Sequence, residues 1–231
     1  MFNTIIEQFK QNQNPEYALK MKAYMKDNFE YFGIKSPLRK QITKPFFLQS
    51  RDLTKIELKI LVKKLWHQPQ RELHYFAQEL AYYKLRTTKK EIRLTVDDIE
   101  FFEFLATHNS WWDSIDFIAP KLMGDYFIEF PEQRSKYIGK WLTSDNKWLI
   151  RCAILFQLKY KNQTDIELVY KTILESVGTN EFFINKAIGW VLRENSKRIP
   201  EEISSFVEFH SDILSNLSKK EALKVLNKLP N

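Results

Sequence analysis

The chain contains few of the residues that interrupt helices or form disulfides. Its 231 residues include one cysteine, five glycines and eight prolines. Glycine and proline are too scarce for the many tight turns of a β-sandwich or barrel. The single cysteine, Cys152, excludes an internal disulfide and fits a reducing compartment. Cys152 lies in an apolar run, where we expect a buried and inert thiol.

Long apolar runs and metal-binding motifs are also missing. No run approaches the roughly 18 residues that a membrane span needs, and the opening residues do not resemble a signal peptide. We therefore expect a cytoplasmic protein without a membrane partner. The histidines are scattered and accompany no cysteine pair, so we expect no metal and no cofactor. These histidines are His67, His74, His108 and His210.

Positive charge is in moderate excess. The sequence has 36 Lys and Arg against 29 Asp and Glu, a formal net charge of +7. Such an excess favours a polyanionic partner, such as nucleic acid or an anionic surface. A moderate positive charge also promotes solubility by itself. Charge alone leaves both interpretations open.

Helix signals recur along the whole chain, and no segment sustains the period-two alternation of a strand. Asn14-Pro15 and Ser36-Pro37 are typical helix starts, and Pro45 predicts a bend or break. Short connections between these segments predict an all-α protein with a single domain spanning residues 1–231. The expected helices cover residues 14–29, 36–47, 56–66 with Asp52 or Thr54 as the cap, 70–85, 97–106, 115–127 with interruptions at Pro120 and Gly124, 131–142, 144–161, 164–177, 181–195, 201–210 and 218–229.

A weak internal repeat connects three of these helices. The segment 153–158 resembles 187–192, and both resemble 77–82. The period lies in the high thirties, which is close to the length of HEAT and armadillo repeats. We therefore expect HEAT-like helix pairs stacked into a superhelical solenoid, with a concave face suited to a long ligand.

The segment from Ser110 to Asp116 contains two adjacent tryptophans followed within four residues by two aspartates. Ser110 and Asp113 have the spacing of a capping box, which gives Asp113 a structural role, and Trp111 is expected to pack behind the helix. Trp112 and Asp116 are four residues apart and share one helix face. Asp116 is either a functional carboxylate or an acid that is solvated or paired with arginine.

Two further segments carry cations among apolar residues. Arg151, with Lys147 alongside, lies on a helix that is apolar almost all round. A guanidinium there needs an internal carboxylate or an anionic ligand such as phosphate, and the sequence favours neither. Lys186, Trp190 and Arg193 form a basic-aromatic-basic stripe, which suits a nucleic-acid groove but also occurs in ordinary helix packing.

In these blocks the chain resembles the AlkD family, bacterial DNA glycosylases of HEAT-like repeats that excise alkylated purines. The resemblance runs through most of the chain, in order. It rests on Asn14-Pro15 with 24–26, on 33–40, on 110–116, on 144–161 and on 186–194. Ser36 stands where threonine is usual, and Lys40 replaces an arginine, which keeps the charge but not the bidentate fork.

The resemblance implies a right-handed superhelical solenoid with a concave basic groove that binds duplex DNA. It implies that Asp116, Trp112 and Trp190 form the active site. DNA-binding roles follow for residues in or near the matching blocks: Arg151, Arg193, Tyr24, Lys186, Lys40, Ser36 and Lys147.

The implied activity is hydrolysis of the N-glycosidic bond of cationic N3- and N7-alkylated purines, without base flipping, by a monomer that works on the nucleoid. The lesion is already cationic, so its base leaves neutral without a general acid. A carboxylate would stabilise the charge that develops on the sugar. Two other classes remain open: a non-catalytic DNA-binding HEAT-repeat protein and a protein-binding HEAT scaffold.

Overall fold

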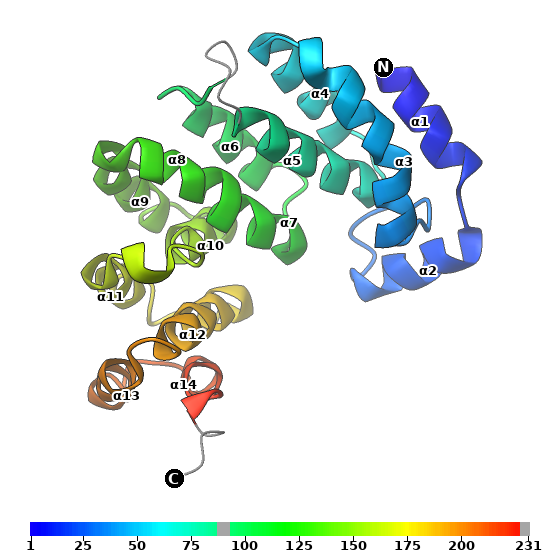
Figure 1. Cartoon of the computed structure of the whole chain (residues 1–231). Helices are drawn as coiled ribbons and strands as arrows, with labels where there is room; N and C mark the ends of the chain where they lie inside the picture. The colour runs from blue at the N-terminus through cyan, green and yellow to red at the C-terminus, as the bar shows by residue number, and fades with distance from the viewer. Residues whose placement is uncertain (87–92, 227–231) are drawn as a thin grey trace. The chain divides into compact units, whose positions relative to one another are not determined.

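The computed structural model describes residues 1–86 and 93–226, and over these residues the chain is helical with no β-strand (Figure 1). The all-α prediction is confirmed. The chain divides into two compact units, unit 1 (residues 1–95) and unit 2 (residues 96–231). The single domain expected from the sequence stays a prediction. Within the described ranges, none of the helices combines the length and apolar character of a bilayer span.

Unit 1 is built from five α-helices and one 3₁₀ turn in its described part. Helix α3 packs against α1 and α5, and α4 packs against α1 and α5. These helices bury an aliphatic and aromatic core that includes Phe9, Leu58 and Phe76. The elements are α1 (Phe2–Gln11), α2 (Pro15–Tyr24), α3 (Ser36–Gln49), η1 (Ser50–Asp52), α4 (Lys55–Trp66) and α5 (Arg71–Leu85).

Unit 2 holds the remaining helices, which are short and closely connected. They are α6 (Asp98–Thr107), α7 (Trp112–Phe117), the π-helix η2 (Ile118–Met123), α8 (Gly124–Glu129), η3 (Pro131–Gln133), α9 (Arg134–Leu142), α10 (Lys147–Leu155), η4 (Lys161–Gln163), α11 (Ile166–Leu174), α12 (Phe182–Ser196), α13 (Pro200–Phe209) and α14 (Asn216–Ala222).

The helices of unit 2 stack in chain order. Helix α10 contacts α7 and α12, and α12 contacts α14, which Figure 1 shows as a succession along this unit. Helices α9, α11 and α13 pack against this row from the neighbouring positions in sequence. Packing between consecutive helix pairs is the arrangement of a helical solenoid, as the repeat in the sequence predicts.

Side-chain caps begin several of the predicted helices. The Asn14 side chain accepts a hydrogen bond from Tyr17 N, and Thr54 forms a full capping box with Glu57. Asp165 caps α11 through Leu168 N. These caps satisfy backbone donors that have no partner within the helix.

Other helix limits differ from the expectation. Helix α3 continues through Pro45, so the predicted break was wrong, and the alternative, a bend, stays a prediction. Asn146, and not Ser144 or Asp145, caps α10, which ends at Leu155, short of residue 161. The last helix, α14, ends at Ala222, and residues 227–229 of the expected helix lie outside the described residues.

The helix expected through residue 29 ends at Tyr24, because Lys26 and Asp27 adopt positive φ values of 57° and 58°. The following loop returns to the start of α2 at Gly33, whose φ is +83°. A Cβ on Gly33 would lie 2.0 Å from Asn14 O, so this close approach requires glycine. The loop and the cap of α2 are therefore locked together.

Pro120 changes the helix type directly after α7. Proline has no backbone N–H, so the carbonyl of Asp116 cannot receive the usual bond from the residue four positions later. The chain follows a π-helix from Ile118 to Met123 and returns to α-helix at Gly124. The helix type therefore changes at Ile118, two residues before Pro120, and again at Gly124, where an interruption was expected.

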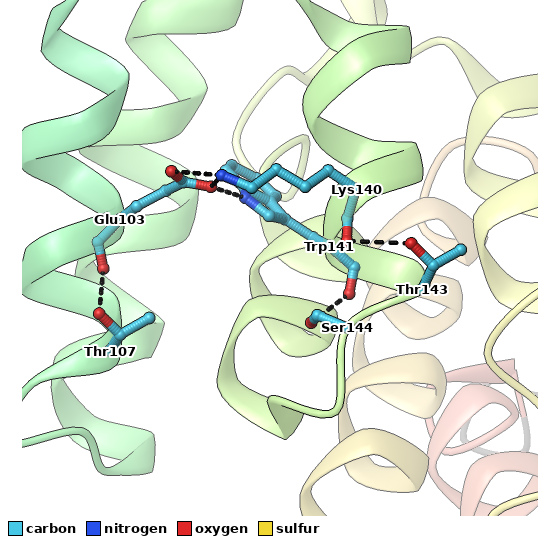
Figure 2. A network of polar contacts seen from close by, with 6 residues as sticks. All are labelled: Glu103, Thr107, Lys140, Trp141, Thr143 and Ser144. Atoms are coloured by element: carbon cyan, nitrogen blue, oxygen red, sulfur yellow. Dashed lines mark hydrogen bonds and ion pairs between the residues drawn. The ribbon is translucent and has the colours of Figure 1, made fainter.

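A polar network joins α6 to α9 (Figure 2). Glu103 accepts hydrogen bonds from Lys140 Nζ at 2.7 and 2.8 Å and from Trp141 Nε1 at 2.5 Å. Trp141 is fully buried, and the carboxylate satisfies its indole N–H. Thr143 and Ser144 hydroxyls donate to the carbonyls of Lys140 and Trp141 where α9 ends.

Candidate functional site

A pocket of about 330 Å³ in unit 2 brings together most of the side chains singled out in the sequence. Helices α7, α10, α12 and α14 supply its walls. Three cations and two carboxylates line it, together with aromatic rings, so the lining keeps a net positive charge. The lining residues are Trp112, Asp116, Arg151, Phe182, Phe183, Lys186, Trp190, Arg193 and Glu221.

Asp116 and Arg151 form the central ion pair of this pocket. Asp116 Oδ1 accepts hydrogen bonds from Arg151 Nε at 2.9 Å and from Nη2 at 2.7 Å. Arg151 Nη1 donates to the carbonyl of Phe183 at 2.5 Å. The Arg151 side chain is 3% exposed and that of Asp116 is 21% exposed. Of the two partners left open for Arg151, the structure shows the internal carboxylate, and its phosphate contact stays a prediction.

The second carboxylate oxygen of Asp116, Oδ2, is not bonded to Arg151. Both bonds from Arg151 end on Oδ1, and Oδ2 accepts no hydrogen bond from the described residues. One oxygen therefore fixes the carboxylate in place, while the other is left for a ligand in the pocket.

Burial raises the pKa of the Asp116 carboxyl above its ordinary value of 3.8. The positive charge of Arg151 and its hydrogen bonds oppose this rise, and the nearby Asp113 adds to it. The carboxyl therefore titrates at a higher pH than an exposed aspartate. Its charged form is sustained mainly by Arg151.

The side chains of the two adjacent tryptophans lie in different surroundings, as expected. Trp111 packs against Trp148 and Phe183, with ring centroids 5.6 and 5.3 Å away, behind the pocket. Trp112, the first residue of α7, lines the pocket with Asp116.

The capping box expected from Ser110 and Asp113 was wrong. Trp111 occupies the cap position of α7 and makes no side-chain cap bond. The Ser110 hydroxyl instead donates to Ala106 O at 2.6 Å. Backbone conformation, and not side-chain capping, begins this helix.

The basic stripe of α12 faces the same pocket but is paired with a residue that the sequence did not single out. Glu221 of α14 accepts from Lys186 Nζ at 2.5 Å and also pairs with Arg193. Its side chain is only 8% exposed. The stripe therefore presents two cations that share one carboxylate.

Close packing of α12 against α14 brings Glu221 into reach. A Cβ on Gly189 would lie 2.6 Å from Glu221 Cβ and 2.8 Å from Ser218 O. The glycine thus permits the two helices to touch. The one signal in the sequence was spacing, since Glu221 follows Lys186 by 35 residues, about one repeat.

The other DNA-binding candidates are not among the residues that line this pocket. Lys147, at the start of α10, pairs with Glu181 at 3.3 Å and lies 5.3 Å from the Trp148 ring. Tyr24, Ser36 and Lys40 belong to unit 1 and are exposed. Tyr24 and Ser36 line a separate cavity there. Their DNA contacts stay predictions.

In the parts of the chain that the structure describes, no cluster of three or more His, Cys, Asp or Glu is placed to hold a metal ion.

Comparison with known proteins gives a consistent result. A sequence profile of the family described as "DNA alkylation repair enzyme" matches residues 5–226. A solved structure titled "Predicted DNA alkylation repair enzyme from Enterococcus faecalis" is 30% identical with a TM-score of 0.84, over 94% of this chain and 98% of that chain. A search of curated proteins gave no match.

Proposed function

The chain belongs to the DNA alkylation repair enzyme family, and on this premise we propose that it is a DNA glycosylase of the AlkD type. Its substrates would be cationic N3- and N7-alkylated purines in duplex DNA, including 3-methyladenine, 7-methylguanine and bulkier adducts. The observation that carries the proposal is the half-buried Asp116, held through Oδ1 by Arg151 in a pocket that Trp112 and Trp190 also line.

The reaction needs no general acid. Alkylation gives the base a positive charge, so when the bond between C1′ and the base nitrogen breaks, its electron pair neutralises the base. Positive charge develops on the deoxyribose, and Asp116 stabilises it electrostatically. Water adds to C1′ and loses a proton to solvent or to Asp116 Oδ2. The products are a neutral alkylpurine and an abasic site.

The surrounding side chains have distinct roles in this proposal. Arg151 is a positioning residue, because it orients the carboxylate and keeps it charged. Trp112 and Trp190 present π-faces to the cationic nucleotide, each contributing about 0.5–2 kcal/mol when desolvated. Lys186 and Arg193 balance Glu221 in the free protein and contact phosphates when DNA is bound.

The proposal includes excision without base flipping. Selectivity would then come from the charge of the lesion and the weakness of its glycosidic bond. We further propose a cytoplasmic monomer that acts on the nucleoid, with Tyr24, Ser36, Lys40 and Lys147 as additional DNA contacts.

Release of free bases tests the proposal directly. DNA treated with a methylating agent is incubated with the protein, and the bases set free are separated and identified. The proposal expects 7-methylguanine and 3-methyladenine with an equal number of abasic sites. Binding to DNA without any base release would support a non-catalytic relative, and absence of DNA binding would support a protein scaffold.

A further inference from the structure

Unit 1 contains a cavity of about 490 Å³ between α2 and α5, and of the residues proposed to contact DNA only Tyr24 and Ser36 line it. Tyr17, Met21 and Tyr24 follow one another at helical spacing on α2. Tyr75 and Gln78 face them from α5. The volume lies in the range of small-molecule sites, which are mostly apolar with a few placed polar groups.

Tyr31 and Ile34, from the loop between α2 and α3, also line this cavity. The Glu72 carboxylate of α5 accepts hydrogen bonds from the backbone N–H groups of Phe32, Gly33 and Ile34, at 3.1, 2.8 and 3.0 Å. Together with the contact between Gly33 and Asn14 described above, these bonds hold the loop to both helices. The cavity is therefore built into the fold and does not depend on a mobile segment.

The two cations that line the cavity, Arg39 and Lys20, are paired with carboxylates of the protein. Arg39 makes a two-pronged ion pair with Glu79, at 2.6 and 2.9 Å. At the rim, Lys20 pairs with Glu16 at 2.5 Å. Because each cation already has a carboxylate, the lining does not call for an anion such as phosphate.

One polar group in the lining lacks a partner. The Gln78 side chain is 3% exposed, and its Oε1 has no hydrogen-bond partner among the described residues. A buried amide oxygen without a partner is unfavourable, and a ligand with an N–H group would satisfy it. Gln78 therefore marks where the polar edge of a ligand belongs.

We propose that this cavity binds a neutral, planar nucleobase, a purine whose N–H edge donates to Gln78. Tyrosine rings and methionine thioethers offer the flat, polarisable contacts that a heteroaromatic ring prefers. A glutamine amide is also the usual partner of an adenine edge. The choice of base rests on the proposed function, because excision of a cationic lesion releases a neutral alkylpurine.

Methyl NMR of the intact protein tests the site directly. The four methionines can be labelled at their methyl groups, and two of them, Met21 and Met25, line the cavity. Met123 is buried in unit 2 and serves as the internal control. Titration with adenine and with 3-methyladenine should shift the Met21 and Met25 signals to saturation and leave Met123 unmoved.

Gln78→Leu is the decisive variant, with Gln41→Leu as its matched control. Gln41 lies exposed on α3 and outside the cavity. Gln78→Leu should weaken base binding at least tenfold, because the ligand edge loses its acceptor. Its melting temperature should not fall, because the variant removes an unpaired buried amide. Gln41→Leu should bind as the wild type does.

Two ligand controls complete the experiment. Toluene offers a ring without an N–H edge, and inorganic phosphate offers only charge. Binding of toluene as tight as that of adenine, or shifts produced equally by phosphate, would overturn the proposal. So would equal base affinity in Gln78→Leu and wild type. If Gln78→Leu does not fold, Tyr24→Ala replaces it, since Tyr24 is 69% exposed and its loss should weaken binding several-fold.

Failure of the base-binding proposal can be distinguished from failure of the glycosylase proposal. Base binding is measured without DNA and is repeated in Asp116→Asn, which should bind adenine as the wild type does. Failure to release bases from methylated DNA would remove the enzymatic role and leave the titration intact. A failed titration would leave base release unaffected.

Discussion

Arg151 directs two hydrogen bonds to the same oxygen of Asp116, from Nε at 2.9 Å and from Nη2 at 2.7 Å. The pair spans 35 residues of sequence and joins α7 to α10. Because Oδ1 receives both bonds, Oδ2 accepts no hydrogen bond from Arg151. This asymmetry leads to the first two predictions.

Asp116→Asn should nearly abolish release of 7-methylguanine and leave DNA binding close to that of the wild type. Asparagine keeps the shape and an acceptor for Arg151 but removes the charge that stabilises the sugar cation. Loss of one such electrostatic contribution costs about 100- to 1000-fold in rate. Single-turnover excision and DNA-binding titrations measure the two effects. Asp113→Asn, three residues earlier and outside the pocket, is the control, and excision by Asp116→Asn at the control's rate would remove Asp116 from its role.

The rate of excision should fall as pH decreases through the pKa of Asp116, because only the carboxylate stabilises the sugar cation. Burial places that pKa above 3.8, so the acid limb should begin at a higher pH than for an exposed aspartate. Arg151→Met removes the charge that lowers this pKa, and it should move the limb to still higher pH. The pH profile of single-turnover rates checks the shift. Arg198→Met removes the same charge outside the pocket and should leave the limb in place.

Glu221→Gln should tighten binding to undamaged duplex. Glutamine no longer neutralises Lys186 and Arg193, so both cations become available to phosphates. The dependence of log K on log salt should steepen by up to about 0.9 for each added phosphate contact. Glu194→Gln makes the same charge change at an exposed pair with Lys197 and should leave the slope nearly unaltered. Equal slopes in the two variants would mean that the stripe does not reach the DNA backbone.

Gly33→Ala should destabilise the protein much more than Gly178→Ala. Both glycines have positive φ, at 83° and 86°. A Cβ at Gly33 meets Asn14 O at 2.0 Å, whereas nothing lies within 4 Å of one at Gly178. We expect about 1 kcal/mol for the backbone strain at Gly178 and about 3 kcal/mol or more at Gly33. Urea unfolding measures both, and similar losses would show that the loop moves to accept the methyl group.

Most helices could be predicted from the sequence because the signals that begin a helix are local. Asn14, Thr54 and Asp165 begin helices wherever their side chains can accept backbone N–H groups, and that chemistry is visible within four residues. The site was predictable from local patterns, such as the helical spacing of Trp112 and Asp116, and from the family resemblance. Both sources indicate Trp112, Asp116, Arg151 and Trp190, and these residues line one pocket.

What was missed depends on contacts between distant segments. Glu221 resembles an ordinary solvated acid beside two lysines, and only the docking of α14 on α12 at Gly189 makes it a partner of the basic stripe. The unit 1 cavity depends on the hydrogen bonds that Glu72 accepts from three backbone N–H groups of a loop about 40 residues earlier in the sequence. No helix signal within a few residues encodes either contact, and only the 35-residue spacing of Lys186 and Glu221 hints at the first.

The ion pairs of unit 2 have a consequence for how the protein is made. Arg151, the counterion of Asp116, follows it by 35 residues in the sequence. Glu221, the counterion of Lys186, also follows its partner by 35 residues. During synthesis each pocket charge therefore emerges before its counterion, and the last counterion comes from the final described helix. A chain that stops before α14 would leave Lys186 and Arg193 without the carboxylate of Glu221. The pocket therefore acquires its full set of charges only after α14 has been synthesised and has packed against α12.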